Sequence, residues 1–121
     1  MIAGLGIDLV SVDRIRRAMA NPRFTQRILT KRERGAGDLT AEHVAGRWSA
    51  KEAVSKCLGR PLRWHDVEVL PDANGAPRAF LREGLLPEGC AILLSITHER
   101  SMAAAVAALV ATSRADPGAM E

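Results

Sequence analysis

Residues 47–59, with the sequence RWSAKEAVSKCLG, decide the fold of this chain. At ~100° per residue, the small and apolar side chains of this stretch fall on one side of a helix. Such a one-sided stripe is typical of a helix that packs on a hydrophobic core. The residues of the stripe are Ala50, Ala53, Val54, Cys57 and Leu58.

The opposite side of the same helix is polar and chemically mixed. Trp48, Glu52, Ser55 and Gly59 follow one another there at spacings of three and four, with Lys51 and Lys56 beside them. One carboxylate next to a hydroxyl and ammonium groups suits a cleft that holds a metal ion beside a phosphate. From spacing alone, however, Glu52 and Lys56 could also be an ordinary surface pair one helical turn apart.

The ends of this helix are marked in the sequence. Thr40 is a suitable N-terminal cap, and Gly59 suits the left-handed residue that follows many helices. Pro61 prevents the helix from continuing. We therefore predict one long helix over residues 41–58.

The N-terminal segment, residues 2–10, alternates like a strand, with Leu5, Ile7 and Leu9 on one face. Gly4, Gly6 and Asp8 occupy the other face. A strand-borne aspartate between apolar neighbours indicates a binding role, although a turn or capping role is the plain alternative. We expect the two glycines to leave room for a ligand beside Asp8.

The remaining segments are read from caps, turns and alternation. We predict short helices at residues 11–20 and in a segment that starts at residue 21. Residues 30–33 match a capping box. Residues 66–70 and 77–82 predict a hairpin around Asn74-Gly75, and residues 90–96 predict a buried strand. Residues 102–112 are ambiguous, and their many alanines favour a helix.

Length and composition predict one domain. The chain has 121 residues, which suffice for one core, and we place the domain at residues 1–112 with a flexible tail at 113–121. Aromatic residues make up only 3%, so the core must be thin, which favours an oligomer. The two cysteines match no zinc pattern. We see no leader peptide and no apolar run long enough to cross a membrane, and we expect a cytoplasmic protein.

The positive charge is concentrated in the first third of the chain. Residues 1–34 hold eight basic and three acidic residues, although the whole chain carries a net charge of only +3. This region could face an acidic protein, an anionic membrane or nucleic acid. Nucleic acid is the weaker alternative because Phe24 is the only aromatic residue there for stacking on bases.

Three segments together resemble a known family. They are GIDLV at residues 6–10, GRWSAKEAVSK at 46–56 and LSITH at 94–98. The chain is similar to the bacterial holo-[acyl-carrier-protein] synthases, the small 4′-phosphopantetheinyl transferases. The resemblance implies an α+β fold in which an antiparallel sheet packs against a long central helix, and a homotrimer with active sites between neighbouring subunits.

The resemblance also implies an activity. Such enzymes transfer the phosphopantetheine arm of coenzyme A to a serine of apo acyl carrier protein and release adenosine 3′,5′-bisphosphate, a reaction that supports fatty-acid or polyketide synthesis. By matching positions, Asp8 and Glu52 would hold magnesium, or manganese in its place. The serine hydroxyl must also lose a proton, and we favour Glu52 as its acceptor, directly or through a metal-bound water. Lys56 would contact phosphate and complete the catalytic group.

Further residues fall in matching regions or carry suitable charge. Those expected to bind coenzyme A are Lys51, Ser55, Lys56, Gly59, Arg60 and His98. Arg14 and Arg17 are our candidates for docking the acidic carrier protein. The chain has Gly59-Arg60-Pro61 where family members commonly have Gly-Thr-Gly, and Trp48 where they usually have Phe. Two alternatives stay open, a non-catalytic relative that binds coenzyme A or carrier protein, and a small basic nucleic-acid-binding domain.

Overall fold

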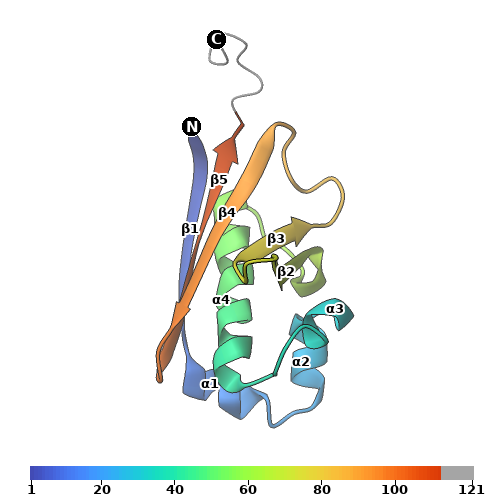
Figure 1. Ribbon diagram of the computed structural model, residues 1–121, viewed down its shortest axis with the longest axis vertical. Coiled ribbons are helices and arrows are strands. Elements are labelled where there is room, and N and C mark those ends of the chain that lie inside the picture. The colour runs from blue at the N-terminus through green and yellow to red at the C-terminus, as the bar shows by residue number, and fades with distance from the viewer. Residues whose placement is uncertain (113–121) are drawn as a thin grey trace.

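The computed structural model describes residues 1–112, and the tail expected at 113–121 lies outside the described residues. Its main sheet has three antiparallel strands in the order β1 (Ile2–Ser11), β5 (Met102–Ala111) and β4 (Cys90–His98). The helix α4 (Ala41–Leu58) runs along one face of this sheet (Figure 1). The α+β class and the antiparallel sheet on a long central helix are confirmed.

The helix α4 has the limits predicted for it. The Thr40 hydroxyl accepts a hydrogen bond from the His43 amide, and Gly59 ends the helix in the left-handed conformation at φ 68°. Three short helices precede it, α1 (Val12–Ala18), α2 (Arg23–Ile28) and α3 (Lys31–Arg34). None of the helices in residues 1–112 is both long and apolar enough to span a bilayer.

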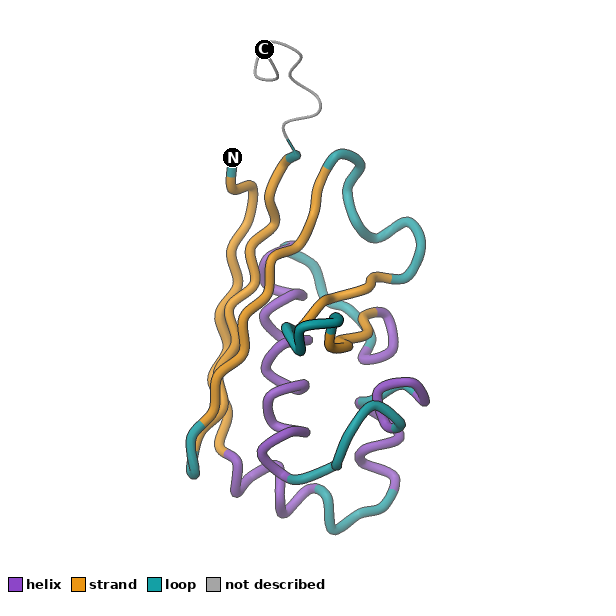
Figure 2. The backbone as a smooth tube through the Cα atoms, in the orientation of Figure 1, coloured by secondary structure: helices purple, strands orange, loops and turns teal. Residues whose placement is uncertain are grey.

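A small hairpin covers the side of α4 away from the main sheet (Figure 2). It consists of β2 (Val67–Pro71) and β3 (Pro77–Leu81), and the short 3₁₀ turn η1 (Trp64–Asp66) leads into it. The predicted hairpin is therefore confirmed. It closes the core around the α4 residues Ala50, Ala53 and Val54, all of which are fully buried.

The helix favoured for residues 102–112 is wrong, because these residues form the central strand β5. Both edges of β5 are hydrogen-bonded, to β1 on one side and to β4 on the other. Its buried side chains include Ala103, Ala105 and Ala107, which lie under α4. Alanine is chosen here for its small size beneath a closely packed helix, and this tertiary requirement outweighs its local helix propensity.

The backbones of α4 and β1 are in direct contact at two glycines. A Cβ atom on Gly6 would lie 2.0 Å from the carbonyl oxygen of Ala53, and one on Gly4 would lie 2.1 Å from that of Cys57. The space beside these glycines is thus filled by the helix, so the expectation that it admits a ligand is wrong. Glycine is needed because no other residue lets the two backbones approach so closely.

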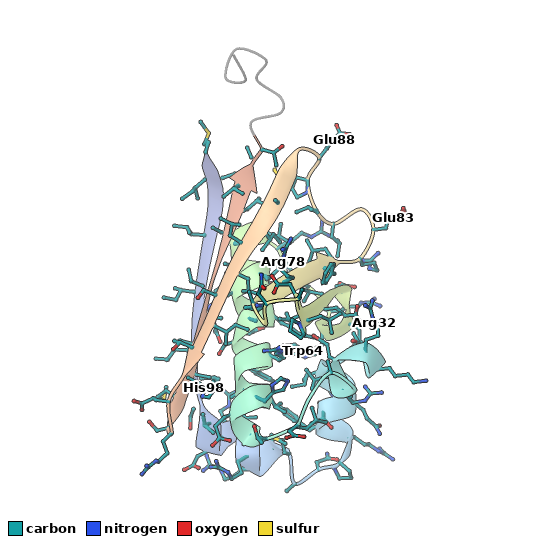
Figure 3. All side chains as sticks on the ribbon, in the orientation of Figure 1. Arg32, Trp64, Arg78, Glu83, Glu88 and His98 are labelled. Atoms are coloured by element: carbon teal, nitrogen blue, oxygen red, sulfur yellow. The ribbon has the colours of Figure 1, made fainter. Side chains whose placement is uncertain are left out.

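The face of the sheet opposite α4 is apolar and exposed. Side chains stand out from it along the strands in Figure 3. In the strand register, Ile7 lies opposite Val106, while Leu5 and Leu93 lie on either side of Ala108. The five large side chains of this outer face are between 42% and 70% exposed, and they are Leu5, Ile7, Leu9, Leu93 and Val106. A patch of this kind is typical of a surface that another protein covers.

The substitution Gly6→Ala tests the backbone contact. The new methyl group would collide with the Ala53 carbonyl, which is rigid backbone, so α4 would have to move off β1. We expect the free energy of unfolding in urea to fall by about 3 kcal/mol. Gly35→Ala is the matched control, because Gly35 has φ −92° and its Cβ would approach no atom closer than 3.6 Å. A Gly6→Ala protein as stable as the control would contradict the contact.

Candidate active site

The close contact of α4 with β1 brings three predicted residues together. Asp8 follows Gly4 and Gly6 on the face of β1 that meets the helix. Its Oδ1 atom lies 3.3 Å from Nζ of Lys56, and the same ammonium group donates to the carbonyl oxygen of Ile7 at 3.0 Å. Lys56 is thus fixed at the strand while half of its side chain stays exposed.

The second oxygen of Asp8 has no partner. Oδ2 is buried and accepts no hydrogen bond within the described part of the chain. A buried carboxylate oxygen without a donor is costly, and a bound cation is one way to satisfy it. A cation bound at this atom would satisfy it, so Asp8 is a candidate ligand for a positive ion.

Glu52 is the second carboxylate of the site. Burial, and next the negative charge of Asp8, raise the pKa of Glu52 above its usual range, while Lys56 and Arg14 act in the opposite direction. Two carboxylates close enough to repel each other can share a divalent cation. No group of three or more His, Cys, Asp or Glu side chains that could hold a metal exists in residues 1–112. A pair of carboxylates suits Mg²⁺, which keeps several water or phosphate ligands.

The C-terminal end of α4 lies one turn beyond this carboxylate pair. The Ser55 hydroxyl donates to the carbonyl oxygen of Arg60 at 2.6 Å, and the Arg60 amide bonds to the Ser55 carbonyl at 3.3 Å. Ser55 therefore stabilises the turn around Gly59. The Arg60 side chain is exposed just beyond the turn. Ser55, Gly59 and Arg60 thus lie on the same end of α4 as Lys56.

Lys51 does not belong to this cleft, which corrects its assignment to coenzyme A. Its ammonium group is buried, with 1% of the side chain exposed, and bonds to Oε1 of Glu33 at 2.6 Å. It also donates to the carbonyl oxygens of Ile28 and Trp64. Burial lowers the pKa of Lys51, against the opposing effect of Glu33. With all three donors used inside the protein, Lys51 has none left for a ligand.

Glu33 completes this buried pair. Besides Lys51, it accepts hydrogen bonds from the backbone amides of Thr30 and Val69. The pair therefore ties α3, the hairpin and η1 to α4. The capping box at Thr30 is confirmed, but nothing in the sequence indicates that its glutamate also meets a lysine 18 residues away.

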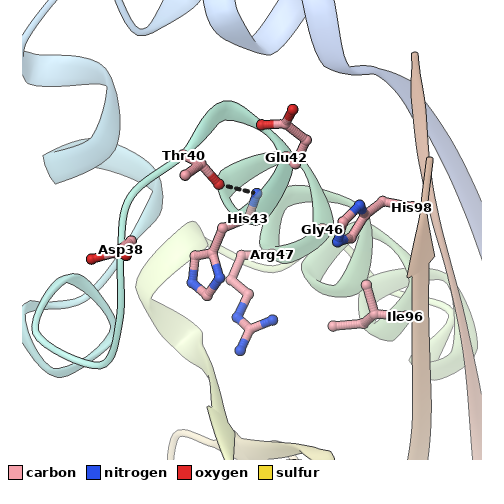
Figure 4. A pocket seen from close by; sticks show the side chains of 8 residues that line it. All are labelled: Asp38, Thr40, Glu42, His43, Gly46, Arg47, Ile96 and His98. Carbon is pink, nitrogen blue, oxygen red and sulfur yellow. Dashed lines mark hydrogen bonds between the residues drawn. The ribbon is translucent and has the colours of Figure 1, made fainter. Parts of the chain in front are cut away.

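His98 lies in a separate pocket, shown in Figure 4. The pocket has a volume of about 320 Å³ and lies between the N-terminal half of α4 and the end of β4. Arg47 and His43 line it from α4. Burial, and next the charge of Arg47, lower the pKa of His43 below its ordinary value of 6.5. The Arg47 guanidinium can bind a phosphate or another anion here, while Asp38 and Glu42 add negative charge to the same lining.

The sequence analysis missed Arg47 and treated His43 as an ordinary surface residue. The available signal was their spacing of four on a predicted helix, which places both on one side. Arg47 and Lys56 point in nearly opposite directions, because nine residues at ~100° make about two and a half turns. Within one chain, the His98 pocket and the carboxylate pair therefore lie on opposite sides of α4.

The two arginines expected to dock the partner lie on α1. Both are exposed. The Arg14 guanidinium lies 5.5 Å from the ring centre of Trp48, and it forms no ion pair with a carboxylate in residues 1–112. Arg16, by contrast, pairs with Asp13 and with Glu42. Arg14 and Arg17 remain the free positive charges of this helix among the described residues.

Comparison with known proteins identifies a family whose model matches most of this chain. The family model of the 4′-phosphopantetheinyl transferase superfamily matches residues 4–108. The holo-[acyl-carrier-protein] synthase of Beutenbergia cavernae is 41% identical over 115 residues, which cover 88% of this chain and 97% of that protein.

Solved structures of similar sequence share the fold. The holo-(acyl-carrier-protein) synthase of Bacillus anthracis, solved in complex with CoA (3′,5′-ADP), is 35% identical with a TM-score of 0.78, over 90% of this chain and 96% of that one. The acyl carrier protein synthase of Mycobacterium tuberculosis is 37% identical with a TM-score of 0.75, over 92% and 99%.

This chain belongs to the 4′-phosphopantetheinyl transferase superfamily, among its holo-[acyl-carrier-protein] synthases. The resemblance inferred from the three segments is thereby confirmed, and the chain is an enzyme of the transferase class.

The contrast between the two lysines of α4 can be measured. Lys51→Met would leave the Glu33 carboxylate buried without its cation, so we expect the free energy of unfolding to fall by about 3–5 kcal/mol. Lys56→Met removes a partly exposed pair, and we expect a change of at most about 1 kcal/mol. Urea denaturation of both variants would show this difference. Equal losses of stability would contradict the structural role of Lys51.

Proposed function

We propose that this chain catalyses magnesium-dependent transfer of the 4′-phosphopantetheine arm from coenzyme A to a serine of apo acyl carrier protein, with release of adenosine 3′,5′-bisphosphate. The observation that carries the proposal is the buried, unpartnered Oδ2 atom of Asp8 beside Glu52 and Lys56. These are the residue types that phosphoryl transfer requires: two carboxylates for the metal and one ammonium group for the phosphate.

The reaction forms a bond between the serine oxygen and the phosphorus nearer the pantetheine. The bond from that phosphorus to the bridging oxygen breaks, and the bridging oxygen leaves with the adenosine bisphosphate. Asp8 and Glu52 would hold Mg²⁺, or Mn²⁺ in its place. When bound, the metal neutralises charge on the pyrophosphate. Lys56 adds a second positive charge to the same phosphates.

Glu52 is our candidate for accepting the serine proton, directly or through a water molecule. Burial and the nearby Asp8 raise the pKa of Glu52 in the metal-free chain, and a bound cation would act in the opposite direction. Its suitability as proton acceptor therefore rests on its place beside Asp8 and Lys56. Ser55, Gly59 and Arg60 would hold the nucleotide part of coenzyme A at the end of α4. Either Arg60 or Arg63 would supply the positive charge for the adenosine 3′-phosphate at this altered loop.

We also propose a homotrimer in which each active site lies between two subunits. The exposed outer face of the sheet, with Val106 on the central strand and Ile7 and Leu93 on the strands beside it, offers the apolar surface for this association. A second subunit would bring its His98 and Arg47 pocket toward the Asp8 and Glu52 of the first. In such an arrangement, His98 would contact coenzyme A bound to the neighbouring subunit, despite its position across α4 in its own chain.

The basic helix α1 would receive the acidic carrier protein, through Arg14 and Arg17. The product would serve fatty-acid synthesis, with polyketide synthesis as a further use. We place the reaction in the cytoplasm, in keeping with two cysteines that form no disulfide in residues 1–112.

Intact-mass measurement tests the activity. The protein is incubated with coenzyme A, magnesium and apo acyl carrier protein, and we expect the carrier to gain the mass of one phosphopantetheine group. Glu52→Gln should slow this gain by about 100-fold or more, because a metal ligand and proton acceptor is lost. Glu88→Gln, on an exposed loop, should leave the rate unchanged. No gain with wild-type protein, while coenzyme A still binds, would favour a non-catalytic relative.

Complementation tests the sites between subunits. Glu52→Gln and His98→Ala subunits are each expected to be weakly active, because each lacks one half of every site. Co-assembly from an equal mixture should restore about a quarter of the wild-type rate, since random trimers form one intact site in four. No recovery in verified mixed trimers would contradict sites shared between neighbours.

Charge reversal tests carrier docking. Arg14→Glu should raise the KM for the carrier protein by about tenfold, with little change in the KM for coenzyme A, because like charges would now meet. Arg16→Glu is the matched control on the same helix. We expect a smaller effect from it, since Arg16 is already paired with acids of this chain. Equal changes in both Michaelis constants would rule against a docking role for Arg14.

A further inference from the structure

Three aromatic side chains from separate elements meet beside the active site. The ring of Trp48 on α4 stacks on Phe24 of α2, with centroids 5.9 Å apart and planes 22° apart. The Trp48 ring also contacts the ring of Trp64 on η1, with centroids 4.5 Å apart and planes tilted by 36°. These contacts involve half-buried rings that pack against the core. The orientation of the Trp48 ring is therefore set by two neighbours.

The Arg14 guanidinium lies over this fixed ring. Its central carbon is 5.5 Å from the ring centroid, within the range of a cation–π contact. A guanidinium held by its flat face keeps its N–H groups free at its edge. Arg14 forms no ion pair within residues 1–112, so those donors are available to another molecule.

The position of Trp48 relates Arg14 to the reaction centre. Trp48 and Glu52 are one helical turn apart on α4, which places them on the same side of the helix. A carboxylate that pairs with Arg14 would thus be held next to the site of phosphoryl transfer.

We propose that Trp48 is a positioning residue, which fixes the guanidinium of Arg14 so that it pairs with a carboxylate of the carrier protein beside the active site. This inference rests on the proposed function. The docking proposal assigns only a positive charge on α1 to the carrier protein. Here the affinity for the carrier also depends on the indole of Trp48 on α4, which need not touch the carrier itself. An arginine without this contact would lose conformational freedom on binding, and its pairing would be weaker.

A double-mutant cycle on the KM for the carrier protein tests the proposal. The variants are Trp48→Leu, Arg14→Gln and their combination. We expect Trp48→Leu to raise this KM by about two- to fivefold, the size of one exposed cation–π contact, with the KM for coenzyme A unchanged. In the Arg14→Gln background the same substitution should have no further effect, because the group that Trp48 positions is already absent.

The control cycle pairs Trp48→Leu with Arg17→Gln. Arg17 lies on the same helix, but among residues 1–112 the cation over the Trp48 ring is Arg14, so the effects of Trp48→Leu and Arg17→Gln should multiply independently. Trp48→Phe, which keeps an aromatic face, should recover most of the affinity. If Trp48→Leu does not fold, judged by circular dichroism, the cycle is run with Trp48→Phe, for which we expect a smaller coupling of the same sign.

The outcomes separate this proposal from the one it rests on. Equal effects of Trp48→Leu with and without Arg14 would overturn the positioning role while leaving the transferase activity intact. If the wild-type protein transfers no phosphopantetheine, the proposed function fails. The same cycle is then measured as the Kd for apo carrier protein by calorimetry, where absence of coupling would overturn the positioning role as well.

Discussion

The direct contact between the backbones of α4 and β1 is the constraint on which the rest of the structure depends. Gly4 and Gly6 allow it, since any side chain there would overlap the carbonyl groups of the helix. The next residue on that face of β1 is Asp8, which consequently lies against the turn that carries Glu52 and Lys56. One packing requirement thus sets both the core and the geometry of the carboxylate pair. It also explains why small residues line β5 beneath the helix.

The two lysines of the central helix belong to one sequence motif but differ in burial, and burial gives them different roles. Lys51 and Lys56 are five residues apart, so they leave α4 on different sides. Lys51 is enclosed with Glu33 and two carbonyl groups, where it joins four elements. Lys56 reaches the strand, where it contacts Asp8 and remains half exposed. A motif read only as a pattern assigns both lysines to the ligand, whereas the contacts of Lys51 leave Lys56 as the candidate of the two.

Local signals predicted most elements, and long-range packing decided what they could not. The caps at Thr40 and Gly59 fixed the limits of α4 because capping depends on residues close in sequence. The strand β5 was missed because two long-range factors decide its conformation. These are the packing of its alanines under α4 and the hydrogen bonds to a strand on each edge. Asp8 and Glu52 were predicted from their chemical type and setting. The pocket of Arg47 and His98 was missed as a unit, because these two residues are far apart in the sequence and come from α4 and β4.

Binding of Mn²⁺ tests most directly whether Asp8 and Glu52 form one metal site. The free ion would be followed by electron paramagnetic resonance during titration of the protein with coenzyme A present. We predict about one Mn²⁺ per chain, with affinity reduced at least about tenfold in both Asp8→Asn and Glu52→Gln and unchanged in Glu88→Gln. Wild-type affinity in the Asp8→Asn protein would contradict the account, because the unpartnered Asp8 oxygen would then have no part in holding the metal.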